Sequence, residues 1–471
     1  MDFIRNNGLL ITTALLITLA VLLIYFGYTE MAIGLLGIST LFVASRKLSN
    51  LVFLLIITTP LSIYFLMPGG SRITLPNEGL LLFISGLFIL KTLSGLHLNL
   101  RYWKHPISII ILIDLFWSFI TCLSSEVLEV SIKRFIIKLL YVLVFFYLIP
   151  PVLKGIKNQK GLFYWYGIGM IIPIIYTTYN HIQLGIGYKT SFQISLPFFD
   201  EHTIYGACIA FVLPFFFLKI WTNSKNKLVY LFLFSILIMA LFLSYSRASW
   251  LSIIVAAVLF IALQLKVSQK QFILIFGIIA GGLFINFNTV YQKLETSNTK
   301  YNNEISSHLV SVTNLQNDAS NLERINRWIC AYKMFKERPL LGFGPGSYQF
   351  IYDRFQSPQY MTRISTHHGN KGNAHSEYLT VLSESGILGL LLFISLIMCS
   401  FFTAVKLIYS NISKKQKLLI TATLLGLVTF YAHGIFNSFI DSSKISILVY
   451  GSLGLIASMS FENNTEDKKQ N

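Results

Sequence analysis

The chain has 471 residues, of which 54% are hydrophobic and only 12% are charged. Soluble proteins carry about a quarter charged residues, so this composition excludes a soluble globular domain and indicates a protein with many membrane spans. The net charge of +17 does not indicate nucleic-acid binding, because the Lys and Arg residues are spread through short loops between apolar runs.

Fourteen apolar runs follow one another along the chain. An apolar segment of about 20 residues spans a bilayer as a helix, so we expect an all-α polytopic transmembrane bundle of about 12–14 helices. The lower number allows for three short runs, at 31–44, 228–245 and 249–265. The runs lie at about 8–27, 31–44, 51–67, 78–97, 107–123, 135–152, 162–180, 203–220, 228–245, 249–265, 271–287, 377–405, 418–436 and 443–459.

These runs divide the chain into four parts. An N-terminal bundle of about eleven helices occupies 1–287, and a large loop follows at 288–376. About three further helices occupy 377–460, and 461–471 is a polar tail. Lys and Arg are most frequent in the short loops that a cytoplasmic N-terminus would place inside. The positive-inside rule therefore predicts both termini in the cytoplasm and the large loop outside it.

The large loop is the one soluble-looking part of the chain. Within it, "LERINRWICAYKMFKERP" predicts an amphipathic helix, with Ile325, Trp328 and Ile329 on its apolar face. Pro339 ends this helix, and "GFGPGS" predicts a turn after it. Loops of this length are usually functional, so we expect the loop to contain short helices that form part of a site.

Arg247 lies in "SYSRASW" between two apolar runs, at the predicted outer face. A guanidinium at the end of a membrane helix is costly unless it is paired or solvated. It can be an interfacial arginine whose charged end reaches the headgroups. Alternatively, it forms an anion site with the neighbouring Ser244, Ser246 and Ser249, at the depth of a lipid phosphate.

Three arginines, Arg324, Arg327 and Arg338, share a second face of the predicted loop helix. A solvated polar face is the simpler interpretation. However, the apolar face of the same helix must be buried on the bundle or the lipid, which would turn these arginines toward the membrane interface. Arginine binds phosphate through two parallel hydrogen bonds and stays charged at physiological pH.

"NAHSEYLTVLSESGILG" (373–389) places His375 at the start of a helix that enters the membrane. In one interpretation, Asn373 or Ser376 caps the helix and His375 is a surface residue. In the other, the imidazole is a general base, because its ordinary pKa is close to neutral. Glu377 either assists His375 as a base or is simply a favourable residue for the first turn of a helix. Glu384 is costly in lipid and is expected to face the protein interior.

Two lesser clusters lie at other helix ends. Asp200, Glu201 and His202 begin one helix, and "HGIFNSFIDSSK" (433–444) ends another. A metal site is conceivable at the first cluster, but the chain contains no HxxH or HExxH spacing there, which argues against it.

Two further charged residues, Asp114 and Lys138, lie within apolar runs. They are expected to pair structurally, with a proton relay as the alternative. The small residues of "GILGLLLF" are expected to let a neighbouring helix approach closely.

Three elements occur in a fixed order in the second half of the chain. They are "SRASW" at the outer end of a membrane helix, "RINRWICAYKMFKERPLLGFGPGSY" in the large loop, and "NAHSEYLTVLSESGILG" after it. In this order they resemble the O-antigen ligase and polymerase superfamily, over about residues 200–460. The first half of the chain is similar to that superfamily only as a set of apolar helices.

The resemblance implies an integral-membrane glycosyltransferase that needs no metal or other cofactor. Its donor would be a glycan linked to a polyprenyl diphosphate such as undecaprenyl diphosphate. Arg247 and Arg324 match the phosphate-binding arginines of the superfamily, and His375 matches its essential loop histidine. Further substrate contacts are expected from Arg327, Glu377, His202 and Arg338.

This assignment agrees with the chemistry of the residues. Fixed arginines would stabilise the charge that develops on the diphosphate leaving group. His375 would accept the proton of the acceptor hydroxyl, which accelerates such reactions by about 10²–10⁴-fold. Attack opposite the diphosphate would invert the anomeric centre.

We therefore expect an O-antigen ligase that transfers the glycan to a lipid A-core sugar, in lipopolysaccharide or surface polysaccharide biosynthesis. It would lie in the inner membrane with its active site facing the periplasm, and its partners would be lipid-linked glycan, glycolipid or glycan acceptor, and membrane lipids. A polymerase of the same superfamily is the first alternative, and a transporter of anionic lipids or glycans is the second. A large separation between Arg247, Arg324 and His375 would count against an enzyme.

Overall fold

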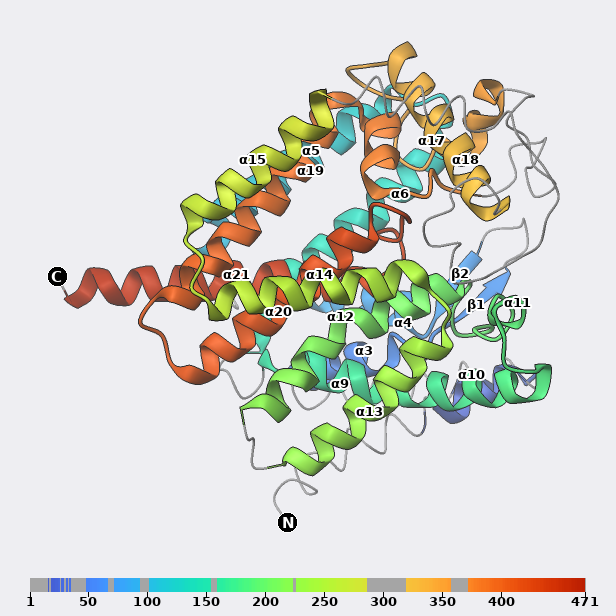
Figure 1. Cartoon of the computed structure of the whole chain (residues 1–471). Helices are drawn as coiled ribbons and strands as arrows, with labels where there is room; N and C mark the ends of the chain where they lie inside the picture. Colours follow the sequence, from blue (N-terminus) through green and yellow to red (C-terminus); the bar gives the residue numbers. More distant parts are fainter. Residues whose placement is uncertain are drawn as a thin grey trace.

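The computed structural model is a bundle of long helices with a smaller helical layer at one end, at the top of Figure 1. The structure describes residues 48–66, 72–93, 101–153, 159–222, 226–285, 319–356 and 372–470, with short pieces between 16 and 34. The predicted runs at 8–27 and 31–44 therefore lie largely outside the described residues, as do the loop segments 286–318 and 357–371.

The bundle confirms the predicted all-α polytopic architecture. Seven of its helical segments are long and apolar enough to cross a membrane, and four shorter apolar helices accompany them in the described part of the chain. The main bundle helices are α3 (Leu48–Thr58), α4 (Asn77–Leu93), α5 (Pro106–Leu123), α6 (Leu128–Tyr141), α9 (Gly161–Gly169), α10 (Ile171–Leu184), α12 (His202–Trp221), α13 (Lys227–Leu243), α14 (Arg247–Gln264), α15 (Gln269–Ile285), α19 (Glu377–Tyr409), α20 (Lys414–His433) and α21 (Ser443–Gln470).

Short elements connect these helices. The back-to-back runs are indeed two helices, α13 and α14, and α21 continues as a helix into the predicted polar tail. A two-stranded antiparallel hairpin, β1–β2, lies at the side of the bundle (Figure 1). The connecting elements are β1 (Ile63–Leu66), β2 (Arg72–Leu75), η1 (Arg101–Lys104), η2 (Val142–Leu148), α7 (Ile149–Val152) and α11 (Tyr188–Ser191).

The centre of the bundle is α12, which is apolar on all sides and almost completely buried. It packs against α9, α13, α14, α20 and α21. In contrast, α13, α14 and α15 expose large apolar side chains on their outer faces, among them Phe232, Val258 and Ile278. Such faces are stable in lipid, because the helices satisfy their own backbone hydrogen bonds.

A cap covers one end of the bundle. It consists of α17 (Ala319–Glu337), α18 (Tyr348–Ile351) and η5 (Tyr352–Phe355), and α17 packs on α19. The predicted amphipathic helix is thus confirmed as α17, with Ile325, Ile329 and Met334 among its buried residues. Arg327 is also buried, at 6% exposure, so its side of the helix is not a solvated face.

The cap is held in place by a break in α19. At Gly386 the backbone leaves the helical conformation, with a φ of 67° and a ψ of −168°. The carbonyl of Leu340 comes so close that a Cβ on Gly386 would lie 2.0 Å from its oxygen, and the Ile387 N–H donates to the Pro339 carbonyl at 2.9 Å. The segment after α17 therefore docks where a neighbouring helix was expected against "GILGLLLF".

The segment from Pro339 to Tyr348 also contacts the turn of α19 that precedes this break. The Phe343 and Gly344 N–H groups donate to the carbonyls of Ser383 and Glu384, at 3.1 and 2.8 Å. The Glu384 carboxylate in turn accepts the N–H groups of Gly346, at 2.8 Å, and Tyr348, at 3.1 Å. As predicted, Glu384 faces the protein interior, where it binds the backbone that leads into α18.

Replacing Gly386 by alanine should loosen the cap. The new Cβ would clash with the Leu340 carbonyl and would require a positive φ, so we expect a loss of at least about 2 kcal/mol of local stability. Cys330 reports this opening, because it is buried in α17 and burial raises its thiol pKa to about 12. In a chain whose other cysteines are replaced by alanine, Gly386→Ala should label Cys330 faster than the parent.

Gly277→Ala is the matched control for this change. Gly277 lies in α15, and no atom of the surrounding structure lies within 4 Å of the place that a Cβ would take, so alanine should leave the labelling rate unchanged. Equal labelling rates for the two variants would contradict the docking role of the break.

Candidate functional site

Several helix ends meet under the cap. The N-termini of α12, α14 and α19 lie here together with the C-terminus of α20, since α12, α14 and α20 pack on one another and the Glu377 N–H donates to the Gly434 carbonyl at 2.8 Å. The first N–H groups of a helix have no partner within the helix and carry partial positive charge. Three N-termini at one place therefore favour an anion.

Arg247 is the first residue of α14. The preceding turn is tight, with a φ of 50° at Tyr245, and Ser246 caps the helix by accepting the Ser249 N–H at 3.4 Å. The turn rests on Gly206 of α12, where a Cβ would lie 2.7 Å from Ser249 Oγ. A cation at a helix N-terminus costs about 0.3–1 kcal/mol, so helix stability does not account for an arginine here.

The Arg247 guanidinium is half-buried and lies 5.8 Å from the centroid of the Tyr188 ring of α11. An aromatic face at this distance attracts a cation and limits its movement. The arrangement holds the guanidinium at the end of the bundle, beside the serine hydroxyls of the turn.

His375 lies just before α19, in a strained conformation with a φ of 48°. The Asn373 side chain holds this conformation, because its Oδ1 accepts the His375 N–H at 2.9 Å and its Nδ2 donates to the Ser438 carbonyl at 2.7 Å. Trp328 of α17 donates from Nε1 to the His375 carbonyl at 3.3 Å. Ser376 is the N-cap, so both predicted capping residues contribute to the geometry. Such strain is typical of functional sites.

Two arginines of α17 act on His375. Arg327 donates from Nη1 to the Asn373 carbonyl at 3.0 Å and forms an ion pair with Glu323, with Nε and Oε1 2.8 Å apart. Burial, together with the charges of Arg327 and Arg324, lowers the pKa of His375 to about 3. The imidazole is therefore neutral at physiological pH and able to accept a proton, but it is a weaker base than the ordinary histidine assumed from the sequence.

A series of polar side chains leads from His375 to α14. The Asn437 side chain is close enough to His375 to influence its pKa, and its Nδ2 is hydrogen-bonded to His433 Nε2 at 2.9 Å. His433 Nδ1 lies 3.3 Å from Ser249 Oγ, two residues after Arg247. Arg324 lies within electrostatic range of both histidines. His375 and Arg324 therefore lie near one polar cluster at the mouth of the bundle, and Arg247 lies two residues before Ser249, which is part of it.

His433 and Asn437 are the members that the sequence placed only in a lesser cluster. Their signal was the spacing of a histidine and an amide, four positions apart, at the end of an apolar run. That spacing does not show which other helix the side chains meet.

The remaining predicted contacts have other direct partners. Glu377 turns toward the segment between α20 and α21, where its carboxylate accepts the N–H groups of Phe439 and Ile440 and the Ser438 hydroxyl. His202, the first residue of α12, is buried with its ring edge-to-face against Phe192, 4.5 Å between ring centroids, and lies within electrostatic range of His433. Arg338 pairs with Glu126 at 2.6 Å, and none of the described hydrogen bonds connects it to His375.

The fold and this mouth define a multi-pass helical membrane protein with a cationic polar site at one end of an apolar bundle. Residues 231–394 match the family model described as O-antigen ligase, which supports the resemblance to the O-antigen ligase superfamily. The matched region contains Arg247, Arg324 and His375. It does not contain His433 or Asn437. A search of characterised proteins gave no match.

The low pKa of His375 can be tested by titration. In the substrate-free protein we predict a neutral imidazole from pH 7 down to pH 5, since burial and two cations disfavour its protonated form. NMR of protein labelled in its histidines, with the signal assigned by His375→Gln, measures this directly. Arg324→Gln removes one cation and should raise the pKa. An inflection near pH 6.5 in the parent protein would contradict the predicted electrostatics.

Proposed function

We propose that the protein is a membrane glycosyltransferase of the O-antigen ligase type. It transfers a glycan from a polyprenyl-diphosphate carrier to an acceptor hydroxyl, in the synthesis of lipopolysaccharide or another surface polysaccharide. The observation that carries this proposal is the polar cluster at the bundle mouth, where Arg324 and Arg327 lie within electrostatic range of a buried His375 and where Asn437, His433 and Ser249 lead from it to the Arg247 turn.

The diphosphate would bind among Arg247, Arg324 and the helix N-termini. These groups are fixed cations and dipoles, which stabilise the negative charge that develops on the leaving phosphate without reorganisation. Guanidinium groups suit this task because they bind phosphate oxygens in pairs and keep their charge. The polyprenyl chain would lie along the apolar outer faces of the bundle.

His375 would act as the base in the transfer step. The acceptor oxygen forms a bond to the anomeric carbon of the donor sugar, its proton moves to the imidazole, and the bond from that carbon to the phosphate oxygen breaks. Binding of the donor would place negative charge beside Arg324 and Arg327. Since these cations depress the pKa of His375, their partial neutralisation would raise it toward the value that proton transfer requires.

The charge distribution of the loops supports a site on the periplasmic side of the inner membrane. A polymerase of the same superfamily would use the same groups on a different acceptor. Many secondary transporters contain discontinuous helices. The break of α19 at Gly386 has another physical explanation, because it receives the segment that anchors the cap.

Substitutions of the three principal residues test the mechanism. His375→Ala and Arg247→Ala should each abolish transfer from a lipid-linked glycan by the purified protein, because one removes the base and the other a phosphate ligand. Arg324→Lys should reduce the rate at least about tenfold, since a point charge does not replace a guanidinium that binds two oxygens.

Arg354→Lys is the matched control for these variants. Arg354 is 61% exposed and pairs with Glu126, so lysine should preserve the rate. Full transfer activity in His375→Ala or Arg247→Ala would rule out the mechanism. Near-normal activity in Arg324→Lys would reduce that residue to a structural role.

A deletion strain separates ligase from polymerase. Long glycans that remain on the carrier lipid, with none on the acceptor, are expected if the protein is a ligase. Single repeat units attached to the acceptor would instead identify a polymerase. Unchanged surface glycan in the deletion strain would contradict both assignments.

A further inference from the structure

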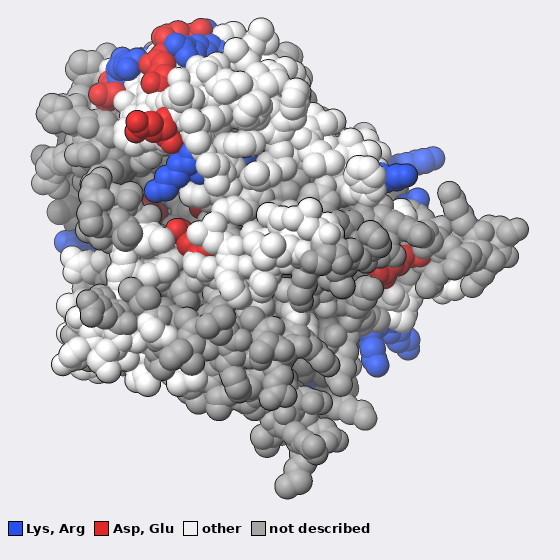
Figure 2. Space-filling model, turned by 180° about the vertical axis from the view of Figure 1, so that it is seen from behind, with Lys and Arg blue, Asp and Glu red and all other residues white. Residues whose placement is uncertain are grey.

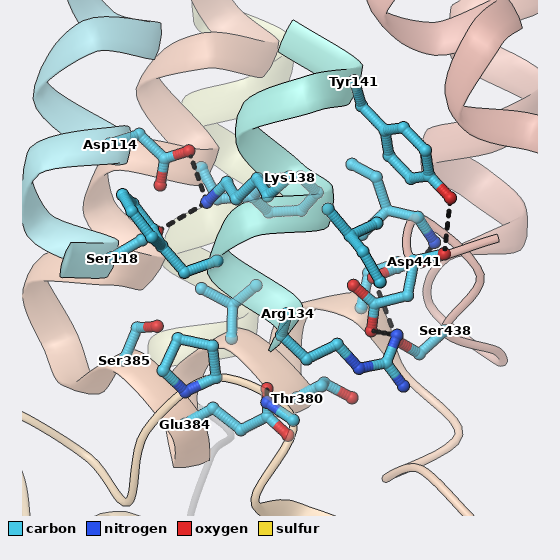
Figure 3. Close-up of a pocket in the computed structure, with 18 of the residues that line it drawn as sticks. Asp114, Ser118, Arg134, Lys138, Tyr141, Thr380, Glu384, Ser385, Ser438 and Asp441 are labelled. Atoms are coloured by element: carbon cyan, nitrogen blue, oxygen red, sulfur yellow. Dashed lines mark hydrogen bonds and ion pairs between the residues drawn. The ribbon is translucent and has the colours of Figure 1, made fainter. Parts of the chain in front are cut away.

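A second polar pocket lies beside this site, between α5, α6, α19 and the segment that joins α20 to α21 (Figure 3). Its volume is about 100 Å³. In the space-filling view from behind, acidic and basic side chains lie close together near a hollow, among the uncharged residues that the structure describes on this face (Figure 2). Nothing in the proposed transfer step uses this pocket.

Two ion pairs line the pocket. Lys138 lies 2.7 Å from Asp114, which confirms the pairing expected from the sequence, and also donates to Ser118 Oγ at 2.7 Å. Arg134 lies 3.0 Å from Asp441. All four charged side chains keep between 22% and 51% of their surface exposed. Charged groups on membrane helices are costly unless they are paired or face a polar cavity, and these four side chains do both.

Thr380 of α19 gives independent evidence for a ligand. Its side chain lines the pocket and lies between Glu384 and Arg134 in Figure 3. Thr380 is only 7% exposed, and its hydroxyl has no hydrogen-bond partner among the described residues. A buried hydroxyl without a partner destabilises the fold, so a ligand that supplies the missing hydrogen bond would bind favourably here.

The chemistry of the lining favours an uncharged ligand rich in hydroxyl groups. The two cations are already balanced by Asp114 and Asp441, so the two ion pairs offer no net positive charge to a phosphate. Arg134 and Lys138 still have N–H donors to offer, and the carboxylates have free lone pairs. The rings of Phe393 and Tyr450 provide apolar surface. Each hydroxyl of a sugar can donate and accept, which matches such a mixed lining.

The pocket is close to the catalytic mouth. Glu377 and Ser438 form the wall between them. The Ser438 carbonyl also accepts a hydrogen bond from the Asn373 side chain, which positions His375. Two residues of extended chain cover at most about 7 Å, so Glu377 lies close to the base. We propose that this pocket is a carbohydrate subsite that binds an uncharged sugar ring of a glycan substrate. The proposal rests on the glycosyltransferase function and extends it.

Binding measurements with Thr380→Val test the subsite. Valine keeps the shape of the side chain and removes only the hydroxyl, so the fold should be retained. Thr423→Val is the matched control, because the Thr423 hydroxyl donates to the Leu419 carbonyl within α20, away from the pocket. Asp441→Asn is a second test variant, which keeps the side-chain shape and removes the charge.

The probes are two lipid-free oligosaccharides released by mild acid from the surface glycan of the producing cell, the repeat-unit glycan and the core oligosaccharide. Calorimetric titration of the full-length protein in nanodiscs should show binding of one of them. Thr380→Val and Asp441→Asn should weaken that binding about 3–10-fold, the effect of one lost hydrogen bond. Binding of the repeat-unit glycan would identify the donor as the source of the sugar, and binding of the core oligosaccharide would identify the acceptor. In both test variants, KM for that substrate should rise while kcat stays unchanged.

Absence of binding by both oligosaccharides, or equal binding by the parent and both test variants, would overturn the subsite. Transfer assays on the same samples keep the two proposals distinct. Normal transfer without a change in binding would reject only the subsite. Variant-sensitive binding in a protein that transfers no glycan would support the subsite and reject the transfer reaction.

Discussion

The docking of the segment from Pro339 to Tyr348 into the break of α19 is the interaction on which the site depends. It joins the cap to the bundle through backbone hydrogen bonds and through the Glu384 carboxylate, which accepts two N–H groups. Hydrogen bonds in a poorly solvated place are electrostatically stronger than those in water. Because α17 immediately precedes this segment, its docking fixes Arg324 and Arg327 over the helix mouths.

The same geometry explains the electrostatics of His375. Burial and, after it, the charges of Arg327 and Arg324 disfavour the protonated imidazole and lower its pKa to about 3. Arg324, one of the two cations that lower this pKa, is also proposed to bind the diphosphate. A base that gains strength only when an anionic donor is present would be inactive in the substrate-free protein. Substrate charge and base strength would thus be coupled through Arg324 and Arg327.

Much of the fold could be predicted because its causes are local. Apolar runs predict membrane helices, and the spacing of Ile325 and Ile329 predicts α17. Because a charge in lipid is costly, the pairing of Lys138 with Asp114 and the inward orientation of Glu384 could also be predicted. The N-cap role of Ser376 could be predicted too, because it depends only on the residues at the start of the helix. The break at Gly386 could not be predicted, since small residues in a membrane helix equally allow a neighbouring helix to approach.

The site was only partly predictable for a related reason. Arg247, Arg324 and His375 stand out because each is a costly or reactive residue at a helix end. Asn437 and His433 gain their role from contacts between α14, α19 and α20, which no sequence spacing specifies. Glu377 appeared to be a neighbour of the base, yet its carboxylate binds the segment between α20 and α21.

A structure of the protein in nanodiscs with polyprenyl diphosphate, without an attached sugar, tests the central claim most directly. The account predicts that the diphosphate lies between Arg247 and Arg324, within hydrogen-bond reach of both guanidinium groups, with the His375 ring facing it. A diphosphate bound elsewhere, for example beside Arg134 and Lys138, would contradict the account.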